Sequence, residues 1–168
     1  LVGPPGAGKT TVAAALGERL GLPVRDTDED VEREPGRTIS AIFTESGEAA
    51  FRALEREAVA RAVAEHAGIL SLGGGAVMDE GTRAVLAGQR VVYLALSMAV
   101  GVKRTGMSDR RPMFVGGNAR AMFKALLEAR VPVYRSVAAL EIDTDHLSVD
   151  EVVDRIVTEL GLSAGGAL

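Results

Sequence analysis

The chain has 168 residues, no cysteine, a formal net charge of −4 and 47% hydrophobic residues. At this length we expect one globular domain over residues 1–168, and the acidic balance argues against binding of nucleic acid, which needs a basic surface. Without cysteine there is no disulfide or thiolate metal site, so an oxygen-bound cation such as Mg²⁺ is the expected metal. No stretch approaches 18 consecutive apolar residues, so we expect a cytoplasmic protein with no membrane partner.

Apolar segments bounded by turn residues alternate with helical patterns along the chain, which is typical of a parallel sheet covered by helices on both faces. We expect strands at residues 1–2, 23–26, 69–72, 90–96 and 138–143. Helices are expected at about 9–20, 28–34, 38–43, 48–66, 79–87, 98–105, 119–135 and 148–160. Because the chain begins within its first predicted strand, we expect its native N-terminus to lie further upstream.

A glycine-rich loop follows the first strand and fits the pattern G-x-x-x-x-G-K-[ST]. Glycines allow backbone N–H groups to approach phosphate oxygens, a lysine neutralises charge on the β and γ phosphates, and the last hydroxyl can ligate Mg²⁺. The predicted helix that follows directs the positive end of its dipole toward the same anion, so the loop predicts binding of a nucleoside triphosphate. The loop consists of Gly3, Pro4, Pro5, Gly6, Ala7, Gly8, Lys9 and Thr10, and Thr11 follows it.

Two carboxylates follow the second predicted strand, at the edge of the sheet where ligands of parallel α/β proteins gather. Asp26 and Asp28 are two residues apart, so their side chains face the same way on a strand. We favour a functional pair, in which one acid helps to hold a metal through water and the other orients a substrate hydroxyl. The alternative is that they only cap the next helix.

Three consecutive glycines, Gly73, Gly74 and Gly75, follow the third predicted strand. Such a run indicates either unusual backbone dihedral angles or close approach of a ligand to the main chain. We favour ligand approach, because a single glycine would usually suffice for a turn.

Arginines outnumber lysines in this chain, so one arginine alone indicates little. Arg52 on the predicted long helix has a simple interpretation as part of a solvated ion pair, and Arg130 as a favourable charge near a helix end. Residues 106–118 lack a helical period and carry glycines at both ends, which is typical of a mobile lid. Arg110 and Arg111 in this segment would neutralise charge during phosphoryl transfer, and Arg104 directly precedes it.

Together these segments closely resemble shikimate kinase, a family within the nucleoside-monophosphate-kinase-like P-loop fold. The resemblance implies a three-layer α/β/α P-loop kinase fold with a five-stranded parallel sheet, a mobile lid and an acceptor-binding region at about 28–66. It implies transfer of the ATP γ-phosphate to the 3-hydroxyl of shikimate, in the pathway to chorismate and the aromatic amino acids; we also expect a monomer. The matching segments are Gly3–Thr10, Asp26-Thr27-Asp28, Phe51-Arg52, Gly73-Gly74-Gly75 and Arg110-Arg111-Pro112.

The resemblance also implies a role for each matching residue. Catalysis would fall to Lys9, Asp28 and Arg111, and the Mg²⁺ of the nucleotide to Thr10 and Asp26. Shikimate would be bound by Asp28, Arg52, Arg130 and the glycines Gly73, Gly74 and Gly75, while Thr11, Arg104 and Arg111 would join the loop in binding ATP. The chain departs from the family pattern in the loop after the last strand, where an Arg and a Pro often contact the adenine; here that loop reads Asp143-Thr144-Asp145-His146-Leu147-Ser148-Val149.

Two other functions remain open at this point. Another small-molecule kinase of the same fold, such as a gluconate kinase, would also bind a carboxylated polyol. A non-catalytic ATP-sensing domain would need the phosphate loop alone. Asp28, Arg52 and the triple glycine favour shikimate over gluconate, and the paired aspartates and lid arginines argue against a sensor.

Overall fold

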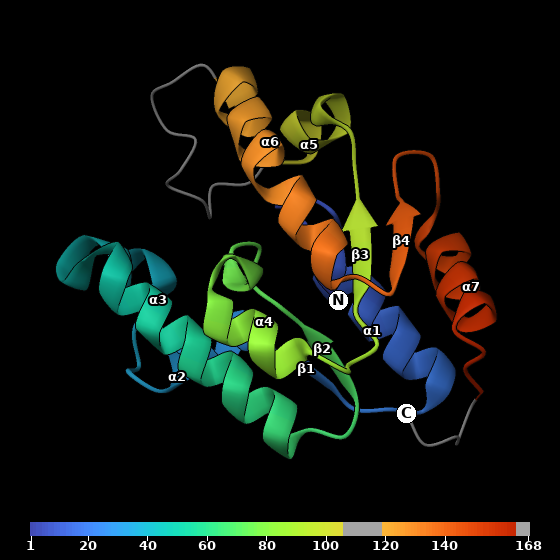
Figure 1. Ribbon diagram of the computed structural model, residues 1–168, viewed down its shortest axis with the longest axis horizontal. Coiled ribbons are helices and arrows are strands. Elements are labelled where there is room, and N and C mark those ends of the chain that lie inside the picture. Colours follow the sequence, from blue (N-terminus) through green and yellow to red (C-terminus); the bar gives the residue numbers. More distant parts are fainter. Residues whose placement is uncertain (106–118, 164–168) are drawn as a thin grey trace.

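The computed structural model describes residues 1–105 and 119–163, which form an α/β fold with helices on both faces of short parallel sheets (Figure 1). The strands are β1 (Val24–Asp26), β2 (Ile69–Ser71), β3 (Val92–Ala95) and β4 (Leu140–Asp143). The helices are α1 (Lys9–Leu20), α2 (Thr27–Arg33), α3 (Ile39–Glu65), α4 (Glu80–Leu86), α5 (Met98–Thr105), α6 (Ala119–Val137) and α7 (Val149–Glu159), with a 3-10 helix η1 (Ala76–Met78).

The two-residue segment Leu1 and Val2 lies between the two pairs of parallel strands. β1 pairs with β2 and β3 pairs with β4. The carbonyl of Leu1 accepts a 3.1 Å hydrogen bond from the amide of Leu72, and Val2 forms a parallel bridge with Tyr93. Because all these pairings are parallel, the carboxyl ends of the strands point toward the same edge, from which the phosphate loop departs.

Hydrophobic cores lie on both faces of β3. Val92 and Leu94 pack into a core with α1 and α7, which contact each other (Figure 1). Tyr93, between them, packs into a second core with residues of α3, α4 and α6, including Tyr134. The alternation of side chains along a strand covered by helices on both sides produces this division.

Most predicted elements are present, with shorter strands than expected. The break predicted near residues 46–48 is a kink in α3 at Gly47, whose φ of 81° and ψ of 170° are not helical. The strand predicted at 90–96 covers only Val92–Ala95, and α6 continues through Pro132 to Val137. The predicted lid at 106–118, with Arg110 and Arg111, lies outside the described residues. None of the described helices has the length and apolarity needed to cross a membrane.

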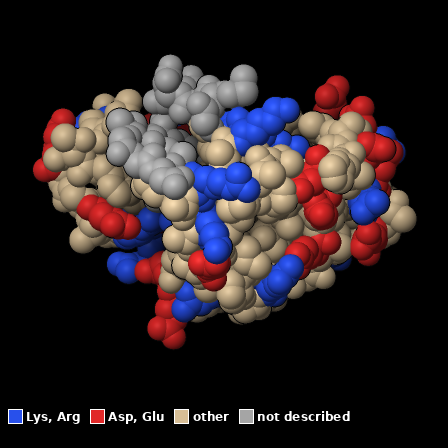
Figure 2. All heavy atoms as spheres, turned by 90° about the horizontal axis from the view of Figure 1, so that it is seen from above, with Lys and Arg blue, Asp and Glu red and all other residues tan. Residues whose placement is uncertain are grey.

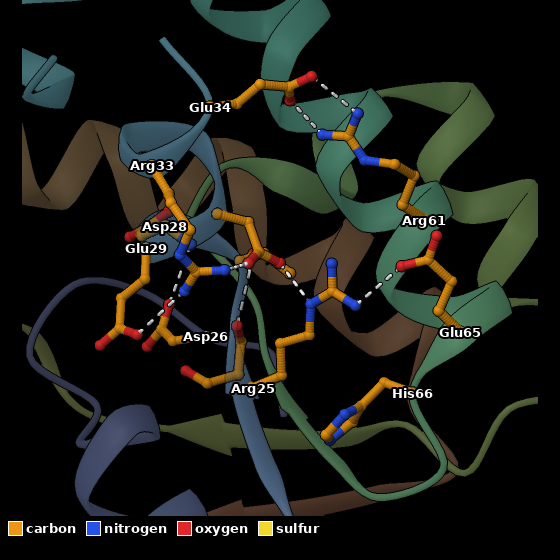
Figure 3. Close-up of polar contacts among 12 residues, drawn as sticks. Arg25, Asp26, Asp28, Glu29, Arg33, Glu34, Arg61, Glu65 and His66 are labelled. Atoms are coloured by element: carbon orange, nitrogen blue, oxygen red, sulfur yellow. Dashed lines mark hydrogen bonds and ion pairs between the residues drawn. The ribbon is translucent and has the colours of Figure 1, made fainter. Parts of the chain in front are cut away.

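A buried ionic network fixes α2, which carries Asp28, against its surroundings. Asp30 is only 5% exposed, and its carboxylate accepts hydrogen bonds from Nε of Arg25 at 2.6 Å and from Nη1 of Arg33 at 2.8 Å. Figure 3 shows Arg25 also reaching Glu65 at the end of α3, at 3.3 Å. The network therefore joins β1, α2 and α3, the elements that carry Asp26, Asp28 and Arg52.

Candidate active site

The glycine-rich loop takes backbone conformations that require glycine and that place the N-terminus of α1 at its end. Gly8 precedes α1 with φ 84° and ψ 18°, the left-handed region. A Cβ at Gly3 would lie 2.5 Å from the carbonyl oxygen of Leu94, so any side chain there would force the loop away from β3. Lys9 is 9% exposed, and its Nζ donates to the carbonyls of Gly3 at 2.9 Å and Pro4 at 3.2 Å. The loop thus curls around the lysine ammonium that the sequence assigns to phosphate binding.

Two oxygen groups suited to a small hard cation meet beside this loop. The Thr10 hydroxyl donates a 2.9 Å hydrogen bond to Oδ2 of Asp26, while Oδ1 of Asp26 accepts from the amide of Asp28 at 3.0 Å and caps α2. In the described part of the chain there is no group of three or more acidic or histidine side chains that could hold a metal. A cation here would therefore rely on nucleotide phosphates and water for most ligands, which is the usual binding mode of Mg²⁺.

The triple glycine lies against charged side chains from α2 and α3. A Cβ at Gly73 would lie 2.5 Å from Oδ1 of Asp28 and 2.6 Å from Oε1 of Glu55, and one at Gly75 would lie 2.4 Å from Nη1 of Arg52. None of the three glycines has a positive φ, so unusual dihedral angles do not explain the run. At Gly73 and Gly75 the groups that closely approach the backbone are the protein's own charged side chains.

Arg52 is held by two glutamates and an aromatic ring. Its Nη1 donates to Oε2 of Glu55 at 2.6 Å and its Nη2 to Oε1 of Glu48 at 3.3 Å. The guanidinium carbon lies 5.1 Å from the ring centroid of Phe51. The interpretation as a solvated ion pair fits only Glu48, since Glu55 is 3% exposed. Burial raises the pKa of the Glu55 carboxyl, and the nearby charge of Asp28 adds to this, although Arg52 opposes it.

Sequence reasoning missed Glu55 as a site residue. A signal was available, because the residues four before it and three after it, Phe51 and Ala58, lie on the apolar face of the predicted helix. A glutamate at a core-facing position needs a partner inside the protein, and here that partner is Arg52.

Arg130 extends from α6 to the same edge. Its Nη1 donates a 2.9 Å hydrogen bond to the carbonyl of Gly74, so it is not the exposed helix-end charge that composition suggests. Asp28, Arg52 and Arg130, widely separated in sequence, thus each contact one glycine of the run from 73 to 75. Gly74 also faces the phosphate loop, since a Cβ there would lie 3.4 Å from Cδ of Pro5. The structure therefore places the predicted acceptor residues next to the predicted nucleotide loop.

Arg104 connects the phosphate loop to the loop after β4. It donates from Nη1 to the carbonyl of Gly6 at 3.3 Å and from Nη2 to the carbonyl of Thr144 at 3.1 Å. Thr11, which follows Thr10 on α1, is exposed. Figure 2 views this side of the molecule, toward which β3 and β4 point, and shows Lys and Arg side chains near the middle of the face.

The residues predicted to bind phosphate and those predicted to bind the acceptor thus lie together at one edge of an α/β sheet, and the class that this fold and site define is the P-loop kinases. A sequence model described as shikimate kinase matches residues 5–161. Shikimate kinase of Saccharopolyspora erythraea is 59% identical over 94% of this chain and 90% of its own length, and that of Thermobifida fusca is 53% identical over 95% and 92%. The solved shikimate kinase from Acinetobacter baumannii in complex with shikimate superposes with a TM-score of 0.91, at 35% identity over 95% of this chain and 89% of that one. The chain belongs to the shikimate kinase family.

Proposed function

We propose that this protein is a shikimate kinase that transfers the γ-phosphate of ATP to the 3-hydroxyl of shikimate, in the pathway to chorismate and the aromatic amino acids. The observation that carries the proposal is the convergence of Asp28, Arg52 and Arg130 on the triple glycine beside the phosphate loop. Members of the family with 45–59% identity over most of the chain support the same function.

The acceptor is small, carboxylated and rich in hydroxyl groups, so polar contacts must provide most of its affinity. Arg52 and Arg130 bind its carboxylate, since hydrogen bonds between charged groups contribute about 1.5–3 kcal/mol each. Gly73, Gly74 and Gly75 form a side-chain-free edge along the ring. Asp28, whose Oδ1 lies against the backbone of Gly73, binds the ring hydroxyls.

Transfer then depends on charge and orientation. Asp28 accepts the proton of the attacking hydroxyl, and Lys9 leaves the carbonyls of Gly3 and Pro4 to neutralise the β and γ phosphates. Thr10 and Asp26 would hold Mg²⁺, Asp26 through water, and the cation would neutralise phosphate charge. Arg104 binds beside the adenine, and the role in catalysis and ATP binding that the family resemblance implies for Arg111 concerns a residue outside those that the structure describes.

We also propose the finer features of the fold and of the protein's state. Leu1 and Val2 would be the central strand of a five-stranded sheet, which their hydrogen bonds to both strand pairs support. Residues 28–66 would form the acceptor-binding region of a single domain, and the segment 106–118 predicted as a lid lies outside the described residues. The protein would act as a cytoplasmic monomer on ATP and shikimate, without nucleic acid or membrane partners.

A coupled assay of ADP release tests the function. Purified protein with ATP and Mg²⁺ is given shikimate, gluconate or a nucleoside monophosphate in turn, and kcat/KM is compared. Shikimate should give by far the highest value, and the gene should restore growth of an auxotroph that lacks shikimate kinase. Faster turnover of gluconate would favour the other kinase of this fold, and ATP binding without any acceptor turnover would favour a sensor.

A further inference from the structure

The carbonyl oxygen of Gly74 accepts hydrogen bonds from two side chains of α6. One donor is Nη1 of Arg130, at 2.9 Å, and the other is the hydroxyl of Tyr134, one helical turn further on. Residues at positions i and i+4 share one face of a helix, so both side chains approach the triple glycine from the same side. The two donors therefore hold one backbone carbonyl between them.

The Tyr134 hydroxyl is fixed in position by the core behind it. The side chain is fully buried, and its ring stacks on Tyr93 with centroids 5.0 Å apart and planes inclined by 23°. Tyr93 belongs to β3, whose neighbouring residue Leu94 donates to the carbonyl of Val2 directly before the phosphate loop. Burial raises the pKa of Tyr134 to about 12, so the hydroxyl remains protonated and keeps donating at neutral pH.

Gly74 is the middle residue of the triple glycine, which is proposed to lie along the ring of the bound shikimate. Its neighbours Gly73 and Gly75 face Asp28 and Arg52, and Gly74 itself packs against Pro5 of the phosphate loop. A shift of the Gly74 carbonyl would therefore move the backbone that the acceptor-binding side chains contact. It would also move the carbonyl oxygen to which Arg130 donates its hydrogen bond.

We propose that Tyr134 is a positioning residue of the acceptor site, an inference that rests on the proposed function. By donating to the Gly74 carbonyl it holds that oxygen where Arg130 can reach it with one donor, Nη1. Arg130 also interacts directly with the Tyr134 side chain, so the contacts with Gly74 and with Tyr134 together set the orientation in which the Arg130 guanidinium meets the carboxylate of shikimate. Tyr134 does not touch the substrate and acts through Gly74 and Arg130.

The test compares Tyr134→Phe with Tyr93→Phe, because each variant loses one hydroxyl from the same stacked pair of buried rings. Steady-state kinetics are measured with shikimate at saturating ATP and with ATP at saturating shikimate, and thermal unfolding serves as a control. Tyr134→Phe should raise the KM for shikimate by about five- to tenfold, the equivalent of one lost hydrogen bond, with kcat within about twofold. Tyr93→Phe should change the same KM by less than about twofold, whatever its melting temperature.

A second measurement separates positioning from a structural effect. In an Arg130→Lys background, which lacks the planar guanidinium, adding Tyr134→Phe should change the KM for shikimate by less than about twofold. Equal KM values for the two Phe variants, or a full Tyr134→Phe effect in that background, would overturn the inference while leaving an active wild-type enzyme. A wild-type protein without activity on shikimate would overturn the proposed function and this inference with it.

Discussion

Glu55 and Arg52 form an ion pair that spans the boundary between core and site. Nη1 of Arg52 lies 2.6 Å from Oε2 of Glu55, and the two side chains are 28% and 3% exposed. The acid is thus buried while the guanidinium reaches the edge formed by Gly75. A buried carboxylate costs stability in its charged form, so this pair contributes to orientation more than to the stability of the fold.

The stability of the protein should carry a pH dependence that comes from Glu55. Its pKa in the folded state is raised above the ordinary 4.5, chiefly by burial, so the folded state binds more protons than the unfolded state between the two values. The contribution of Glu55 is present below about pH 4.5 and is lost as pH rises through the folded-state pKa. In Glu55→Gln this dependence disappears.

The measurement is the free energy of unfolding of wild type and Glu55→Gln by denaturant at several pH values from about 4.5 to 8. The wild-type value minus the variant value should decrease as pH rises, because contributions of other groups cancel in the difference. Glu48→Gln, which removes the exposed partner of the same arginine, is the matched control and should show little dependence. A difference that increases with pH would contradict the assignment.

Alanine substitutions in the triple glycine should differ sharply from one another. At Gly73 and Gly75 a methyl group would collide with the ends of Asp28, Glu55 and Arg52, which can move aside, so the protein should fold while the acceptor site is displaced. We expect the KM for shikimate to rise by at least about tenfold. The corresponding loss of binding free energy lies within the range of about 1–3 kcal/mol that overpacking typically costs. At Gly74 the methyl group would instead face Gly3 and Pro5 of the phosphate loop at ordinary contacts of 3.4 Å or more, so Gly74→Ala should raise the KM for shikimate less than the other two variants do. A higher KM for shikimate in Gly74→Ala than in the other two variants would refute the steric explanation.

Asp26→Asn should weaken the binding of Mg²⁺, so that activity requires more of the metal, without destabilising α2. Asparagine caps helices as well as aspartate does, but its neutral amide is a poorer partner for the cation and its water. The Mg²⁺ concentration for half-maximal activity should rise by about 10- to 100-fold, and chelation of the metal should abolish activity of the wild type. Asp79→Asn, at the corresponding cap of α4, is the control and should leave the Mg²⁺ titration unchanged. Identical titrations for all three proteins would exclude the metal role of Asp26.

Asp30→Asn should destabilise the fold more than it affects catalysis. It removes the charge that both Arg25 and Arg33 contact, and we expect a loss of roughly 2–3 kcal/mol in the free energy of unfolding. Glu34→Gln, which breaks the exposed pair with Arg61 seen in Figure 3, should have little effect. Equal stabilities of the two variants would argue against the buried network as an anchor for α2.

The parts of the site that could be predicted from the sequence are those encoded by neighbouring residues. The phosphate loop depends on backbone conformations set by its own glycines, and Asp26 and Asp28 follow directly from the end of a strand. Tyr134 was missed because its role depends on which distant segment packs against it. The burial of Glu55 could be read from its place on the apolar face of the predicted helix, but its position beside Gly73 depends on distant packing as well. A carboxylate beside Gly73 and a hydroxyl on the Gly74 carbonyl exist only once α3 and α6 have packed near the end of β2.

Asp28→Asn tests most directly whether the acid beside Gly73 accepts the proton of the shikimate hydroxyl that attacks the γ-phosphate of ATP. The measurement is kcat for shikimate together with the dissociation constant of ATP for wild type and variant. Loss of a general base should lower kcat by about 10²- to 10⁴-fold, while ATP binding stays within about twofold, since the phosphate loop is untouched. Wild-type turnover of shikimate by Asp28→Asn would contradict the proposed chemistry of the site.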